Sequence, residues 1–236
     1  VTVFASCQKD QIEPTNQDMN VVSEQTTDPN QTPGVNEKDL GCNLLPTADY
    51  AKLQHIPDQF AVQALPATYT LATPAVGNQG GEGSCVGWGT AYAARSIYYK
   101  VANGQSSYAN NVNVFSPEYV YNQIKVNSSC TSGAYVSSAL NLLKNKGVCT
   151  WAQMTYSSTN GCSLLPTYKQ NLAAANYKIN GWGTVNRTVS NFKNLLYTNK
   201  PIIVAGPVDS NFDFLGYNQV LTQYNSATYR IGRASC

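Results

Sequence analysis

The sequence is short of charged residues, histidine and long apolar runs. Only 12% of the 236 residues are charged, the net charge is +2, and a single histidine is present. No basic run occurs, so we expect no nucleic-acid partner. No apolar stretch is long enough to span a bilayer, and no C-x-x-C pair or Cys/His cluster predicts a metal site. We therefore expect no metal, no other cofactor, and a monomer.

The amino-terminal residues predict export. Residues 1–7 (VTVFASC) resemble the end of a signal peptide followed by a lipoprotein processing site, at which Cys7 would receive the lipid. Residues 8–39 are rich in Gln, Asn, Asp, Thr and Pro, which predicts a disordered tether. The expected location is the bacterial cell envelope, periplasmic or surface-exposed, with a membrane contact only through the lipid on Cys7. The alternative is an ordinary cysteine near a chain end.

After a transitional segment at residues 40–64, which includes a short helix at 48–54, residues 65–236 predict one folded α+β domain. Helices are expected from an N-cap at Ser84 to about Gly104, from Ser116 with Pro117 in the first turn, and over 135–146. Strands are expected at 177–185, at 201–205 and from about 229, with a short helix after Thr188. Helices first and strands second favour a fold with two lobes.

The stretch from Gln79 to Cys85 (QGGEGSC) predicts a nucleophile. A thiol at a helix N-terminus is shifted toward its thiolate by the helix dipole, and the thiolate is the reactive form. The side-chain amide of Gln79 can donate a hydrogen bond to an oxyanion. The alternative is that Cys85 is a small buried apolar residue and Gln79 an ordinary turn residue, which leaves the glycine-rich approach unexplained.

This stretch resembles the nucleophile motif Q-G-x-C-G-S-C-W of papain-like cysteine peptidases. Further matches follow in the family's order. With the family's own motif in parentheses, they are residues 115–118 (L-S-E-Q), 130–135 (C-N-G-G-Y-P), 139–140 with 146–148, 154–156 (Y-P-Y) and 200–202 (N-x-P-V). The resemblance covers roughly residues 65–236. It implies a papain-like fold with a helical first lobe that carries the nucleophile helix and an antiparallel β second lobe, incomplete in these residues.

The resemblance also implies roles for single residues. Cys85 would be the nucleophile, and Gln79 with the Cys85 backbone N–H would form the oxyanion hole. The implied substrate-binding residues, which contact the peptide backbone or border its specificity pocket, are Gly83, Ser132, Gly133, Ala134, Tyr135 and Ala205. The implied function is that of a cysteine endopeptidase, which hydrolyses peptide or protein substrates through a thiolate acyl-enzyme.

Three departures from the family pattern affect this prediction. Val86 replaces the tryptophan beside the nucleophile, although an aromatic residue stands two positions later at Trp88. Glu82 replaces a cysteine that in the family bonds the one matched by Cys130. Cys130 therefore has another partner, Cys162 being one candidate, or stays reduced. A carboxylate at Glu82 would oppose thiolate formation unless it points to solvent.

The third departure concerns the catalytic base. The one histidine, His55, precedes the nucleophile, whereas the family's catalytic His and Asn follow it by more than a hundred residues. We expect His55 to be an exposed loop residue, the 236 residues to be truncated before the catalytic pair, and this fragment to be inactive. Two alternatives to a peptidase are a non-catalytic papain-like protein that binds peptides or partners, and a structural surface lipoprotein. A structural surface lipoprotein would leave the Gln79–Cys85 spacing unexplained.

Overall fold

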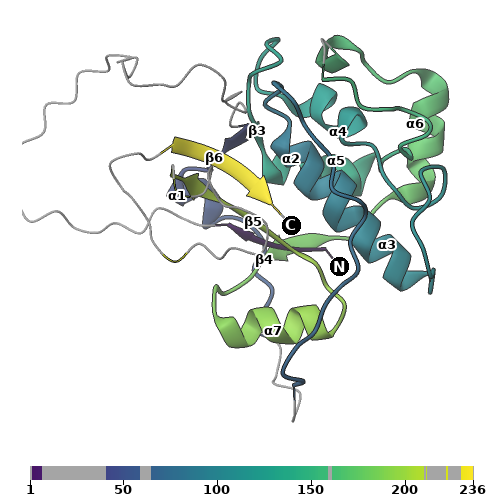
Figure 1. Ribbon diagram of the computed structural model, residues 1–236. Coiled ribbons are helices and arrows are strands. Elements are labelled where there is room, and N and C mark those ends of the chain that lie inside the picture. The colour runs from purple at the N-terminus through teal and green to yellow at the C-terminus, as the bar shows by residue number, and fades with distance from the viewer. Residues whose placement is uncertain are drawn as a thin grey trace, which may run out of the picture.

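The computed structural model describes residues 2–6, 41–58, 65–158, 161–209, 211, 222 and 230–235. Within these ranges a group of helices packs against a β-sheet, which confirms the predicted α+β class (Figure 1). No helix among the described residues is long and apolar enough to cross a membrane. The whole of the predicted tether at 8–39, and Cys7 itself, lie outside the described residues.

The nucleophile helix consists of three consecutive segments, α2 (Cys85–Gly87), η1 (Trp88–Arg95) and α3 (Ser96–Ala102). Its extent is as predicted, but η1 has π-helical hydrogen bonding, a local widening that is common near functional sites. Ser84 stands at the N-cap position without a side-chain cap bond. Its hydroxyl lies 2.6 Å from the Tyr156 hydroxyl instead, so the prediction of Ser84 as a capping side chain is wrong.

The helices α4 (Pro117–Ile124) and α5 (Val136–Asn145) pack beside the nucleophile helix, where they were predicted. Ser116 Oγ accepts a hydrogen bond from Tyr119 N at 3.0 Å and caps α4. Just after α5, Gly147 has a φ of 86°, and a Cβ there would lie 1.9 Å from the Ala174 carbonyl oxygen. A glycine is therefore required at this exit.

The helical half ends with η2 (Gly161–Ser163), α6 (Tyr168–Ala174) and η3 (Ala175–Tyr177). The sequence prediction missed α6. This helix begins with a reciprocal capping box between Thr167 and Gln170, which is a pattern legible in the sequence as T-x-x-Q.

Among the described residues, the sheet half has four strands in the order β4 (Trp182–Thr184), β1 (Thr2–Ser6), β5 (Ile202–Val208) and β6 (Arg230–Ser235). β1 runs parallel to both of its neighbours, and β5 and β6 are antiparallel. The sheet is therefore mixed, and the predicted antiparallel arrangement holds only for β5 and β6. Local sequence patterns near 182 and 202 do not reveal that a segment from the start of the chain lies between these strands.

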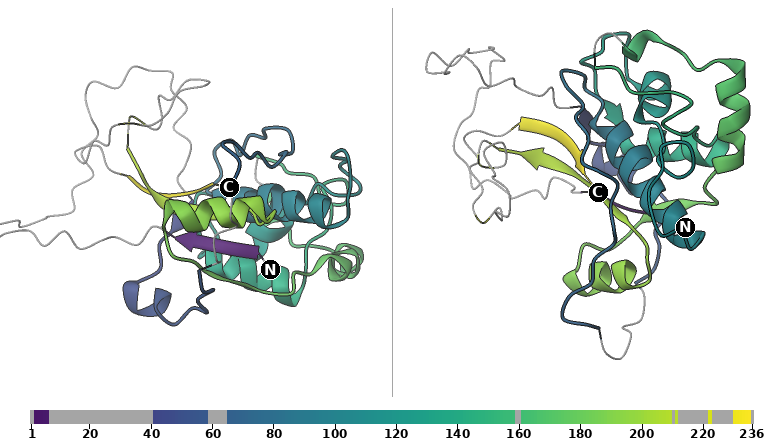
Figure 2. Two further views of the ribbon diagram at one scale, coloured as in Figure 1. Left: turned by 90° about the horizontal axis from the view of Figure 1, so that it is seen from below. Right: turned by 45° about the vertical axis from the view of Figure 1, so that its right-hand side comes forward.

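Two smaller groups of elements complete the fold. α7 (Val189–Tyr197), capped by Thr188 as predicted, packs on β5 and covers a small core of Val185, Leu195 and Ile202. β2 (Cys42–Asn43) pairs in parallel with β3 (Ala134–Tyr135), and α1 (Thr47–Tyr50) follows it. The segment predicted as transitional is thus attached to the domain. In each view the helices of residues 85–145 lie on one side of the molecule and β5 and β6 on the other (Figure 2).

Candidate active site

Cys85 occupies the first position of α2, at the N-terminus of the continuous helix 85–102. Its side chain is 3% exposed, and its sulfur is outside any disulfide. The loop before it turns at Gly80, which has a φ of 62°. This turn brings Gln79 back toward the helix, where its Nε2 donates to the Glu82 carbonyl oxygen at 2.9 Å. The predicted nucleophile and oxyanion donor therefore belong to one tightly bonded turn.

Tyr156 holds this turn from the other side. Its hydroxyl donates to the Gln79 carbonyl oxygen at 2.6 Å and lies 2.6 Å from Ser84 Oγ. Burial raises the pKa of Tyr156, so the phenol keeps the hydrogen that these bonds require. The sequence matched Tyr156 to a family motif without assigning it a role, and that match was the signal for this contact.

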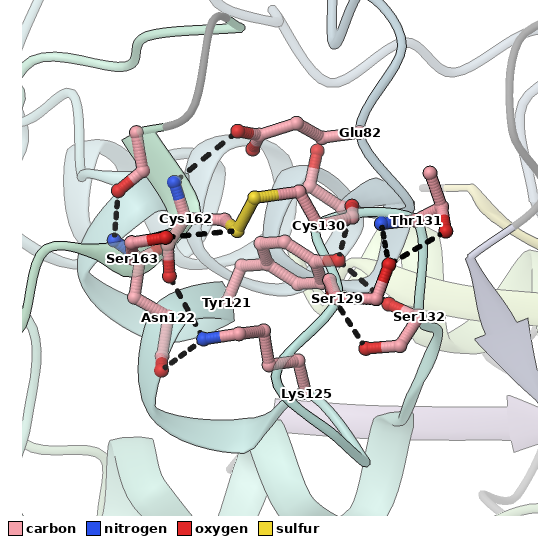
Figure 3. The surroundings of a disulfide bond; sticks show 12 residues. Glu82, Tyr121, Asn122, Lys125, Ser129, Cys130, Thr131, Ser132, Cys162 and Ser163 are labelled. Carbon is pink, nitrogen blue, oxygen red and sulfur yellow. Dashed lines mark hydrogen bonds between the residues drawn. A yellow bond between two sulfur atoms is a disulfide. The ribbon is translucent and has the colours of Figure 1, made fainter.

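Glu82 is buried beside a disulfide between Cys130 and Cys162 (Figure 3). Its Oε1 accepts a hydrogen bond from the Cys162 N–H at 3.2 Å, and its Oε2 accepts one from Tyr156. The sequence left the partner of Cys130 open, and the structure shows that it is Cys162. Of the two possibilities stated for Glu82, the one in which it points to solvent is wrong. The side chain is 2% exposed, and burial raises its pKa, which favours the neutral form.

The carboxylate of Glu82 and the two sulfurs of the disulfide lie within 4.8 Å of one another. Sulfurs in a disulfide carry no thiolate and do not bind a metal as thiolates do, so this group is not a metal site. Its arrangement instead shows how the family's missing cysteine is replaced. Cys162 supplies the second sulfur, and Glu82 binds the backbone of Cys162.

The wall next to the nucleophile is formed by Gly83 and the 130–133 loop. Gly83 N donates to the Cys130 carbonyl oxygen at 2.9 Å, and a Cβ on Gly83 would lie 2.6 Å from the Thr131 carbonyl oxygen. The Tyr121 hydroxyl fixes the loop by donating to the Ser132 carbonyl oxygen at 2.6 Å (Figure 3). The structure therefore brings Gly83 close to the Thr131 and Ser132 backbone. It adds Tyr121, which the sequence analysis missed.

The remaining predicted substrate-binding residues lie in or beside β3 and β5. Ala134 and Ala205 belong to the same buried cluster as Cys85, and Tyr135 ends β3 half-buried. The segment around Gly41 already covers Gly133 and Ala134: the Ala134 N donates to the Gly41 carbonyl oxygen at 2.8 Å, and a Cβ on Gly133 would lie 2.9 Å from the same oxygen. Residues 41–43 were not predicted here, and no local sequence pattern indicates this pairing.

His55 lies at the far edge of the sheet. Its Nδ1 is 3.3 Å from Thr184 Oγ1, its backbone pairs with β4, and its side chain is exposed. The strand in contact with α2 is β6, at the opposite edge. Four strand spacings of about 4.8 Å place His55 roughly 19 Å from β6. The histidine is therefore exposed and outside the site around Cys85.

Known proteins resemble this chain in sequence and in fold. Residues 57–233 match the family of papain family cysteine proteases. The fold is similar to that of xylellain, a cysteine protease from Xylella fastidiosa, with a TM-score of 0.67 and 20% identity over 84% of this chain and 78% of that one. No curated protein matches the sequence. At this identity the structural likeness concerns the fold alone. The family match spans most of the chain, and the protein therefore belongs to the papain family of cysteine proteases.

Proposed function

We propose that the protein is a cysteine endopeptidase that hydrolyses peptide bonds through a thiolate acyl-enzyme on Cys85. The observation that carries this proposal is the position of Cys85 at the N-terminus of a continuous helix, directly after the turn that holds Gln79. The helix dipole favours the thiolate at that position. A thiol buried without such a helix end would be shifted the other way.

The chemistry follows from the groups around the sulfur. The thiolate of Cys85 attacks the scissile carbonyl, and the amine leaves with a proton supplied by an acid; water then hydrolyses the thioester. The Gln79 amide and the Cys85 backbone N–H stabilise the oxyanion. A carboxamide nitrogen carries two hydrogens, so the bond from Gln79 to the Glu82 carbonyl orients the amide without exhausting its donor capacity.

The imidazole that serves Cys85 is, we propose, not among these 236 residues. His55 is the one histidine of the sequence, and it pairs with Thr184 at the other edge of the sheet. We expect the purified 236-residue chain to leave a fluorogenic peptide intact, whereas the product of the complete gene cleaves it. Hydrolysis by the 236-residue chain that disappears in Cys85→Ala would overturn this statement.

The peptidase assignment is tested with a peptidyl epoxide that alkylates thiolates. In the product of the complete gene we expect the label on Cys85 and none in Cys85→Ala. The matched control is Cys149→Ala, which should keep the label, because burial raises the pKa of Cys149 to about 12 and leaves it unreactive. A folded protein that takes up no epoxide at Cys85 contradicts the assignment.

A non-catalytic peptide-binding function is the second candidate. One observation favours it: β3 already holds an extended segment of this chain, with the Ala134 N–H bonded to the Gly41 carbonyl. Under this alternative an extended peptide would bind β3 without being cleaved. Equilibrium binding of a peptide that survives prolonged incubation with the product of the complete gene would select this candidate over the peptidase.

We also propose that the protein is exported to the bacterial cell envelope and anchored by a lipid on Cys7. The sequence of residues 1–7 and the composition of 8–39 support this. Processing at Cys7 would remove Thr2–Ser6, which is the strand β1. Intact-mass analysis of protein from a bacterial membrane fraction should show a lipid-modified Cys7 as the first residue. A mature chain that keeps residues 2–6 and an unmodified Cys7 contradicts the anchor.

A further inference from the structure

Residues 41–43 lie along the part of the site that the proposed function gives to the substrate. β2 pairs with β3 in parallel, with Cys42 opposite Ala134. Gly41 contacts Gly83 so closely that a Cβ on Gly41 would lie 1.8 Å from the Gly83 carbonyl oxygen. A Cβ on Gly133 would lie 2.9 Å from the Gly41 carbonyl oxygen. The segment therefore lies against the backbone of the turn that ends in Cys85 and against the neighbouring 130–133 loop.

This contact prevents a peptide from using the same hydrogen-bonding groups. The Ala134 N–H is bonded to the Gly41 carbonyl, and the close approach at Gly83 leaves no space for a second chain. A substrate can bind only after the segment has moved. β2 is two residues long, so this movement breaks few backbone hydrogen bonds.

The segment also brings a second thiol to the nucleophile. Cys42 is 2% exposed and belongs to the same buried cluster as Cys85. Burial raises the pKa of Cys42, and the nearby Cys85 raises it further. The backbone geometry brings the two segments together, because Cys42 directly follows Gly41, and Gly41 packs on Gly83, two residues before Cys85. Both residues are thiols in the structure.

We propose that Cys42 and Cys85 form a redox latch, in which a disulfide between them fastens residues 41–43 in the cleft and blocks the nucleophile. This rests on the proposed role of Cys85. The oxidant is a low-molecular-weight disulfide, RSSR. Cys85 attacks RSSR, which gives a Cys85–SR mixed disulfide and one RSH. Cys42 then attacks the Cys85 sulfur and releases the second RSH. The two cysteines lose two protons and two electrons, and RSSR is reduced to two thiols.

The order of these steps follows from the two environments. Cys85 stands at a helix N-terminus, which favours its thiolate, and it is therefore the thiol that reacts first. Cys42 is buried without such a helix end, so it attacks second, when the mixed disulfide lies beside it. An excess of a small dithiol reverses both steps and returns the two cysteines to thiols.

The latch is tested on the product of the complete gene by peptide mapping, which needs no turnover. Dilute protein is incubated with oxidised glutathione, remaining thiols are alkylated, and the digest is analysed without reduction. We expect a Cys42–Cys85 cross-linked peptide in addition to Cys130–Cys162. In Cys42→Ser and Cys42→Ala the nucleophile should instead carry glutathione, and Cys149→Ser should cross-link as the wild type does. A wild-type Cys85 that carries glutathione while Cys42 is alkylated overturns the latch.

Activity separates failure of the latch from failure of the peptidase assignment. We expect oxidised wild type to be inactive without bound glutathione, and dithiothreitol to restore full hydrolysis. Activity in the reduced protein with no cross-link on oxidation rejects the latch and keeps the peptidase. A cross-link without activity in the reduced protein rejects the peptidase and keeps the thiol pair. Gly41→Ala, which cannot pack on Gly83, should lower cross-linking several-fold, whereas Gly81→Ala, which meets no atom within 4 Å, should not.

Discussion

The helical half of the molecule comes almost entirely from one stretch of chain, whereas the sheet is assembled from distant ones. Residues 77–177 supply the turn, the nucleophile helix and the disulfide. The four strands come from residues 2–6, 182–184, 202–208 and 230–235. Bringing distant segments together costs more chain entropy than closing local turns. The half that carries Cys85 is therefore expected to unfold less readily than the sheet.

The two halves also differ in what they bury. The helical half buries polar side chains that bond its loops together, among them Glu82, Glu118 and Asn122. The described sheet half buries fewer polar side chains, namely Thr184, Asn191, Asn194 and Asp209. Its apolar residues form a small cluster under α7 and, from β5, contribute Ile203 and Ala205 to the main core. Buried polar groups are costly to leave without partners, so they fix one arrangement of the loops around the nucleophile. Substitutions in the helical half should therefore lower the free energy of unfolding more than substitutions in the sheet half.

The largest effect is expected from removal of the disulfide. Cys130 and Cys162 are separated by 32 residues, and opening a loop of this size lowers the free energy of unfolding by about 3–4 kcal/mol. The double variant Cys130→Ala/Cys162→Ala should show this loss in urea unfolding curves recorded without reductant. The wild type with reductant should behave like the variant. A loss below about 1 kcal/mol would mean that the bonds of Glu82 and Tyr121 already hold the loop.

Sequence reasoning succeeded where a local pattern has a local cause. The Ser116-Pro117-Glu118 start of α4 is such a case, since the cap, the proline and the acid each act within one turn. The turn from Gln79 to Cys85 is another, because Gly80, with a positive φ, lets the chain turn so that the Gln79 amide bonds to the Glu82 carbonyl. The family resemblance supplied the order of these elements and the two-lobed architecture.

Sequence reasoning failed where a distant residue competes for a local group. Ser84 has the side chain of an N-cap, but Tyr156, far along the chain, takes its hydroxyl. Glu82 reads as a charge that points to solvent or opposes a thiolate, but it is buried against the Cys162 N–H, and burial raises its pKa. The positions of β1 and β2 depend on pairings with strands far away in sequence, and no periodicity in either short segment specifies a partner. Cys42 was unassigned for the same reason.

An intermediate effect is expected from pH, acting on the helical half. Burial raises the pKa of Glu118 to about 6 from an ordinary value of 4.5; the Asn122 hydrogen bond opposes this, and the neighbouring Glu82 adds to it. The folded state therefore keeps a proton that the unfolded state loses. The stabilisation is complete below pH 4.5 and is lost as the pH rises through about 6. A shift of this size corresponds to about 2 kcal/mol.

This pH dependence is checked by urea unfolding at intervals between pH 4 and pH 8. In Glu118→Gln the free energy of unfolding should fall less steeply between pH 4.5 and 6. The decrease that remains is due to Glu82, whose pKa is also raised by burial. Asp49→Asn, a change on exposed α1, is the matched control and should keep the wild-type curve. A Glu118→Gln curve with the wild-type slope would assign the pH dependence to another group.

The smallest effects come from two helix caps, one in each half. Ser116 caps α4 and is fully buried, so Ser116→Ala leaves the Tyr119 N–H without its partner away from water, at a cost of about 2 kcal/mol. Thr188 caps α7 at an exposed position, where water can replace its hydroxyl, and Thr188→Ala should cost about 0.5–1 kcal/mol. Thr188→Ser keeps the hydroxyl and should be nearly neutral. Because the two caps make the same bond, the ratio of their costs measures how much more the helical half depends on buried polar contacts. Equal losses in the two alanine variants would remove that distinction between the halves.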